Sequence, residues 1–127
     1  MSSPVRPPAV AGTFYPHDPG ELAAWVGELL GATSPAGDLV ACVAPHAGYV
    51  YSGGVAGQVY AHLRVPRRVV VLGPNHTGLG PDVAVAPPRA WQTPLGEVAV
   101  DRELADLLLE EHPTAEQEWT AHWREHS

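Results

Sequence analysis

Apolar residues run almost without interruption through two segments in the middle of the chain, residues 39–44 and 69–73. Such continuous runs are typical of strands that are covered on both faces, as in a parallel sheet. Each run leads into a proline and then a histidine, in the sequences PH and PNH. Proline has no backbone N–H and favours an extended residue before it, so we expect each strand to end at its proline.

The segment between the two runs predicts a helix. In residues 53–64, the apolar side chains of Val55, Val59 and Leu63 recur at helical spacing, and Pro66 ends the pattern. A strand, a helix and a second strand in this order form a right-handed unit whose two strands are parallel. In open sheets of this kind, ligands bind at the carboxyl ends of the strands.

Two histidines follow the predicted strands at matching positions, His46 after the first and His76 after the second. Neighbouring strands lie about 4.8 Å apart, so two such imidazoles can reach the ~2.0–2.1 Å from one ion that a metal such as zinc requires. Gly48 and Gly78 follow the histidines and allow the backbone to turn sharply beside a ligand. Two ligands do not complete a metal site, but the matching positions predict a metal or catalytic role for His46 and His76, with the two glycines in the pocket.

Two further residues are candidates for the same pocket. Tyr49 lies in the loop after His46, and Asn75 directly precedes His76. Asn75 is placed to hold a polar group of a ligand, although an asparagine in a turn usually serves the backbone conformation. The glycine-rich turn after His46 also has an alternative interpretation as an anion site at a helix N-terminus. Neither the lysine-bearing P-loop nor the GxGxxG pattern is present to support that alternative.

Two more amphipathic helices are expected, one on each side of this central unit. Asp18 and Pro19 form the start of the first helix, which ends at Gly31, and Asp101 caps the second, which ends near His112. Their inner faces carry apolar residues three and four positions apart, namely Leu22, Trp25, Val26, Leu29 and Leu30 in the first and Leu104, Leu107 and Leu108 in the second.

The remaining segments complete the expected fold. Residues 82–86 and 96–100 predict two short strands of a hairpin near the sheet edge, and residues 114–118 form an acidic connection. Residues 5–16 are an extended arm against the core. The fold class that we predict is α/β, a mostly parallel or mixed central sheet flanked by helices.

Composition and charge exclude several classes of function. The chain of 127 residues is expected to form one domain, and its 14 acidic against 7 basic residues give a net charge of −7, which argues against nucleic-acid binding. No apolar stretch is long enough for a membrane span and no leader pattern is present, so we expect no membrane association and a cytoplasmic setting. The single cysteine, Cys42, excludes an intramolecular disulfide.

The segments RPPAVAGTFYP, VAPHAGYVYSG, LGPNHTG, WQTPLG and REHS resemble those of the Memo family. Members of this family are similar to class III extradiol dioxygenases, which hold a non-haem iron at the ends of sheet strands. The resemblance implies that His46 and His76 are the first two metal ligands. It also implies that residues 1–127 are the N-terminal portion of a single Memo-like domain that is incomplete at its C-terminus, because the family's downstream cysteine and histidine have no counterpart in this chain.

His126 is a further candidate by the same resemblance, which places the histidine of REHS near the active crevice. It is our candidate catalytic residue, as a histidine that moves protons. His122 and His126 are four positions apart, a spacing that suits a helical metal site, but the glutamate of the HExxH pattern is missing. We therefore interpret His126 through the resemblance and not through this pair.

The function implied by the resemblance is that of a metal-binding protein with a mononuclear site of iron, copper or zinc. The resemblance also implies an oxidoreductase activity related to that of the extradiol dioxygenases. The residues themselves leave open whether the protein is an enzyme. The alternative is a non-enzymatic module with a structural or vestigial metal pocket that binds partner proteins of a radical-SAM-associated system. The substrate and the oligomeric state do not follow from the sequence.

Overall fold

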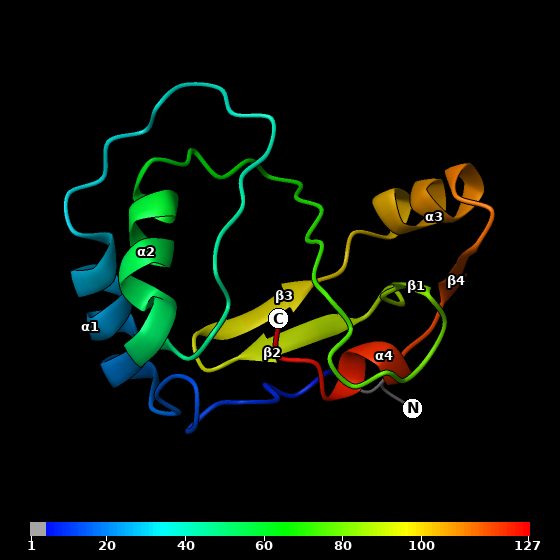
Figure 1. The fold of residues 1–127 in the computed structure, drawn as a ribbon, viewed down its shortest axis with the longest axis horizontal. Helices are drawn as coiled ribbons and strands as arrows, with labels where there is room; N and C mark the ends of the chain where they lie inside the picture. The colour runs from blue at the N-terminus through cyan, green and yellow to red at the C-terminus, as the bar shows by residue number, and fades with distance from the viewer. Residues whose placement is uncertain (1–4) are drawn as a thin grey trace. The chain divides into compact units, whose positions relative to one another are not determined.

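The computed structural model describes residues 5–127. The described chain divides into two compact units, one formed by residues 10–69 and the other by residues 5–9 together with 70–127. Each unit is described by itself (Figure 1). The single domain expected from the sequence stays a prediction.

The first helix, α1 (Pro19–Leu30), has the boundaries that its capping residues predict. The Asp18 carboxylate accepts a hydrogen bond from the backbone N–H of Glu21 at 2.9 Å, and Gly31 ends the helix with a φ of 54°. Leu22 is buried and the other predicted inner residues of α1 are half-buried, which confirms the expected apolar face.

The second helix, α2 (Tyr49–Ala61), begins earlier and ends earlier than residues 53–64. Gly48 is its N-cap residue, and the residues expected in a loop after His46 form its first turn. The predicted apolar stripe was wrong, because Val55 is 58% exposed. The buried face consists instead of small residues four positions apart, Gly53, Gly57 and Ala61.

This small-residue face packs directly on α1, beside which α2 lies in Figure 1. A β-carbon on Gly53 would lie 2.9 Å from Cδ1 of Leu29, and one on Gly57 would lie 2.3 Å from the Leu29 carbonyl oxygen. Such approach of two helix backbones requires residues without a side chain. The larger apolar residues of α2 are therefore turned to other sides of the helix, which explains the failure of the predicted stripe.

The second unit contains two small sheets. β1 (Val83–Val85) pairs in parallel with β4 (Ala115–Gln117), and β2 (Ala90–Thr93) forms an antiparallel hairpin with β3 (Gly96–Ala99). The predicted hairpin paired residues 82–86 with residues 96–100, and its first strand was wrong. Residues 83–85 form β1 in the other sheet, and β2 is the hairpin partner of β3. The expected acidic connection at residues 114–118 is also wrong, since it contains β4. The pairing of β1 with β4 has no local sequence signal, because the two strands are far apart in the chain.

Two helices complete this unit. α3 (Arg102–Glu111) starts where Asp101 was expected to cap it, with the Asp101 carboxylate accepting from the N–H of Leu104 at 3.0 Å. It packs against β1 and β4, although Leu107 and Leu108 are exposed and Ala105 is its buried residue. The short α4 (Thr120–Trp123) follows β4.

The fold class is confirmed as mixed α/β, with one parallel and one antiparallel pair of strands and helices packed beside them. The two predicted central strands, however, are not strands. Residues 39–44 and 69–73 lie in irregular backbone, and Val40 and Leu72 are 103% and 91% exposed. A strand forms only where a neighbour satisfies its backbone groups, and no described residues pair with either segment.

Among residues 5–127, none of the helices combines the length and the apolar character needed to cross a membrane.

Candidate metal centre

His76 is held by Glu125, a residue far from it in the chain. Nδ1 of the His76 ring lies 2.7 Å from Oε1 of Glu125, and the backbone N–H of His76 donates to Oε2 at 2.7 Å. The His76 side chain is 39% exposed, whereas that of Glu125 is 9% exposed. The glutamate is therefore buried behind a histidine that reaches the surface.

The Glu125 carboxylate receives several hydrogen bonds, which keep it ionised. Oε1 also accepts from the backbone N–H of His126 at 2.8 Å and from that of Ser127 at 3.1 Å. Burial opposes ionisation of the Glu125 carboxyl, but the bonds from His76 and from the two following backbone N–H groups outweigh it and lower its pKa to about 2. Glu125 is thus an anion at neutral pH.

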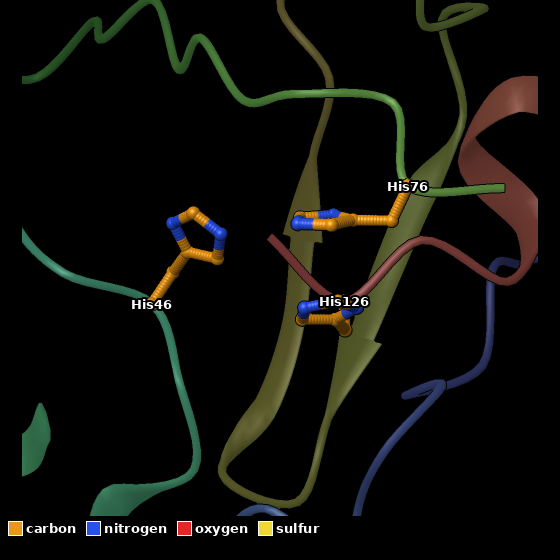
Figure 2. A group of neighbouring side chains, drawn as sticks. All are labelled: His46, His76 and His126. Atoms are coloured by element: carbon orange, nitrogen blue, oxygen red, sulfur yellow. The ribbon is translucent and has the colours of Figure 1, made fainter. Parts of the chain in front are cut away.

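His126 lies next to His76. The two imidazole rings are stacked, with centroids 4.1 Å apart and an angle of 29° between their planes. Figure 2 shows the ring of His76, from the loop after residue 73, and the ring of His126, from the C-terminal segment, one above the other. Sequence reasoning named both residues, and the structure brings these two together within one unit.

Arg6 anchors the segment that carries Glu125 and His126. Its guanidinium donates to the carbonyl oxygen of His122 at 2.6 Å and to that of Glu125, and it lies 4.2 Å from the centre of the Trp91 ring. Arg6 is 7% exposed and its backbone pairs with the hairpin strand β2. The N-terminal segment thus fixes the C-terminal one.

Sequence reasoning missed both Arg6 and Glu125. Each lies in a segment quoted for the family resemblance, RPPAVAGTFYP and REHS, but charged residues are expected at the surface unless a partner is known. No feature of either segment marks these charges as buried, because the groups that they bind lie far away in the sequence.

His122 does not join His76 and His126. Its ring packs on Trp91, with centroids 5.8 Å apart. Burial lowers the pKa of His122, so this imidazole is neutral at physiological pH. His122 and His126 thus lie in different surroundings although they are four positions apart in the sequence.

His46 belongs to the other unit, in irregular backbone before α2, and is exposed. Gly48 caps α2, and the backbone N–H of Tyr49 donates to the carbonyl of Phe14 at 2.8 Å. The Tyr49 ring also packs against two other aromatic rings. Its centroid lies 5.4 Å from that of Tyr15 and 5.6 Å from that of Trp25. Figure 2 also draws the ring of His46, and its role beside His76 stays a prediction.

Asn75 and Gly78 shape the loop that carries His76. Oδ1 of Asn75 accepts from the N–H groups of Thr77 and Gly78 at 3.1 and 2.9 Å, and its amide donates to the Leu79 carbonyl at 2.7 Å. Gly78 has a φ of 68°, which favours glycine. The side chain of Asn75 thus organises its own turn.

The chemistry of the pair fits a metal ligand. A ligating histidine characteristically donates its second ring N–H to a carboxylate or carbonyl group, as His76 does to Glu125. A ring nitrogen of His76 and one of His126 lie within 4.8 Å of each other. Two nitrogens bound to one tetrahedral ion are about 3.3 Å apart, so these two imidazoles lie near the separation that a shared ion requires.

Comparison with known proteins bears directly on this site. The family model described as Memo-like protein matches residues 6–127, a range that contains every candidate residue named above. This chain belongs to the Memo-like protein family. The expected resemblance is therefore confirmed.

Memo-family relatives match over nearly the whole chain. The MEMO1 family protein of Aquifex aeolicus is 47% identical over 125 residues, which cover 97% of this chain and 46% of that protein. The MEMO1 family protein of Ignicoccus hospitalis is 45% identical over 137 residues, covering 97% of this chain and 48% of that protein. The chain spans about half the length of the curated relatives that it matches.

Proposed function

We propose that this Memo-like chain provides histidine ligands to a mononuclear metal centre, with His46 and His76 as ligands and His126 beside them. One observation carries the proposal: the His76 ring is bound through Nδ1 to a buried carboxylate and stacks on a second imidazole. The inclusion of His46 rests on its matching position in the sequence and on the resemblance. Imidazole donors suit iron, copper and zinc, so the ligand type alone does not identify the metal.

Each residue has a distinct part in this proposal. A bound ion of this class supplies Lewis-acid or redox chemistry to the oxygen atoms of a substrate. His76 presents one nitrogen to the site while Glu125 holds the other. His126 is the residue that holds or moves a proton at a substrate oxygen, because imidazole is the commonest side chain in general acid–base catalysis and its ring lies against that of His76.

The resemblance extends the proposal to an oxidoreductase related to the extradiol dioxygenases. Action in the cytoplasm, beside partner proteins of a radical-SAM-associated system, belongs to the same proposal. Its alternative is a partner-binding module in which the metal is structural. The test is to load the protein with ferrous iron and add a catechol. Consumption of oxygen then supports the oxidoreductase. Stoichiometric binding of iron without oxygen consumption supports the partner-binding module.

Elemental analysis of the purified chain tests the metal centre itself. We expect bound metal in the wild type and a loss of most of it in His46→Ala and His76→Ala. His62→Ala is the matched control, because His62 is an exposed histidine that closes the C-terminus of α2 and should retain the wild-type content. Full metal content in both site variants would overturn the proposal.

A further inference from the structure

We propose that Glu125 is a positioning residue that fixes the tautomer and direction of the His76 ring, so that Nε2 is the nitrogen offered to a ligand. The tautomer itself is a property of the chain alone, and only its use for metal rests on the function proposed above. Oε1 of Glu125 already accepts from the backbone N–H groups of His126 and Ser127 and so acts as an acceptor, which means that its short contact with the ring requires a proton on Nδ1 of His76. A neutral ring with its proton on Nδ1 carries its lone pair on Nε2.

The Glu125 carboxylate contacts His76 at two points, whereas a chance ion pair would involve the ring alone. Oε1 binds the ring and Oε2 binds the backbone N–H of the same residue, both at 2.7 Å. One planar carboxylate thus fixes the ring relative to its own backbone. Rotation of the imidazole about its side-chain bonds breaks at least one of these two contacts.

The same contacts occupy one oxygen of the Glu125 carboxylate. Its Oε1 atom accepts from the backbone N–H groups of His126 and Ser127 in addition to its contact with the His76 ring. A carboxylate oxygen has two lone pairs, so these contacts leave Oε1 no position for an ion. In this inference Glu125 acts through His76.

The glutamate is itself fixed on both sides. Arg6 binds the Glu125 carbonyl, and the Ser127 hydroxyl donates to the carbonyl of Pro74 at 3.1 Å. Pro74 lies just before the loop of His76, so the C-terminal segment and that loop are joined at two places. A rigid support of this kind is what places a ligand ring accurately, because a carboxylate on a mobile segment would not restrict it.

Nitrogen-15 NMR of the histidine rings tests the inference in residues 1–127 without metal. In the neutral ring of wild-type His76, we expect a protonated Nδ1 and an unprotonated Nε2. A wild-type His76 with its proton on Nε2 would overturn the inference directly, whether or not any variant folds.

Two substitutions sharpen this test. Glu125→Ala removes both acceptor oxygens, so we expect the Nε2–H tautomer of His76 to become populated. Glu118→Ala is the matched control, since Glu118 accepts from the N–H of Ala121 at 2.9 Å in the same segment and its loss should leave the His76 tautomer unchanged. An unchanged tautomer in folded Glu125→Ala, or an equal change in Glu118→Ala, would contradict a positioning role.

Zinc titration of the same proteins separates this inference from the proposed function. We expect Glu125→Ala to raise the zinc dissociation constant about 10- to 100-fold over the wild type, as is usual for loss of a carboxylate behind a ligating histidine. If the wild type shows the expected tautomer but binds no zinc or ferrous iron, the positioning of His76 stands and the metal centre is refuted. If zinc binds with equal affinity to both proteins, the positioning role is refuted and the metal centre stands.

Discussion

Gly57 of α2 and Leu29 of α1 lie so close together that a β-carbon on the glycine would be 2.3 Å from the leucine carbonyl oxygen. Gly57→Ala must therefore push the two helices apart. We expect it to lower the free energy of unfolding by about 1–3 kcal/mol, the usual cost of overpacking.

Gly54 provides the control for this prediction. It lies in the same helix, and a β-carbon there meets nothing within 4 Å. Gly54→Ala should raise the free energy of unfolding by up to about 1 kcal/mol, because alanine is the better helix former. Urea denaturation followed by circular dichroism measures both variants. Equal effects of the two substitutions would show that close packing of α1 and α2 is not what Gly57 provides.

Arg6→Lys should destabilise the chain although it keeps the charge. The guanidinium binds two carbonyl oxygens and covers the Trp91 ring, and a lysine ammonium cannot reproduce this planar arrangement. We expect a loss of about 1.5–3 kcal/mol in the free energy of unfolding, the range for hydrogen bonds to charged groups.

The comparison for Arg6 is Arg102→Lys. The Arg102 side chain is 79% exposed and lies 3.8 Å from Asp106, a pair that contributes little. Thermal unfolding of both variants should show a clear decrease for Arg6→Lys and almost none for Arg102→Lys. A melting temperature unchanged in both would mean that the contacts of Arg6 do not stabilise the C-terminal segment.

The Tyr49 phenol should ionise at a higher pH than the phenol of an exposed tyrosine. Burial raises the pKa of the Tyr49 phenol above its ordinary value of 10.0, and the charge of Tyr60 adds to the effect. The neutral phenol is thus favoured in the folded chain, so its contribution to stability is present below pH 10 and is lost as the pH rises through the raised pKa. Alkaline titration of phenolate absorbance should show a late phase that is absent in Tyr49→Phe. A late phase that persists in this variant would contradict the assignment.

The parts of the fold that depend on neighbouring residues could be predicted from the sequence. Asp18 and Asp101 fix the starts of α1 and α3 because a capping carboxylate acts within its own first turn. Pairings between distant residues could not be predicted. β4 carries two polar residues in three positions and has no alternation that distinguishes a strand from a connection, so only its partner β1 reveals it.

The candidate site was predictable to a similar degree. His76 and His126 could be named from their motifs, but Glu125 could not, because an acidic residue beside a histidine carries no sign of the residue that it will bind 49 positions away. Residues 39–44 and 69–73 show that a sequence pattern can also predict strands that do not form. Their apolar pattern describes strands buried on both faces, and a strand cannot form from its own residues when no described segment pairs with it.

The central claim is that His46 and His76 bind a metal ion, and zinc titration followed through the nitrogen-15 signals of all histidine rings tests it most directly. We expect the ring nitrogens of His46 and His76 to change together and to stop changing at one equivalent of zinc. The exposed His62 and His112 should keep their signals over the same range. If His46 and His76 keep their signals while zinc is added, or change no more than His62 and His112, the metal centre proposed for this Memo-like chain does not exist.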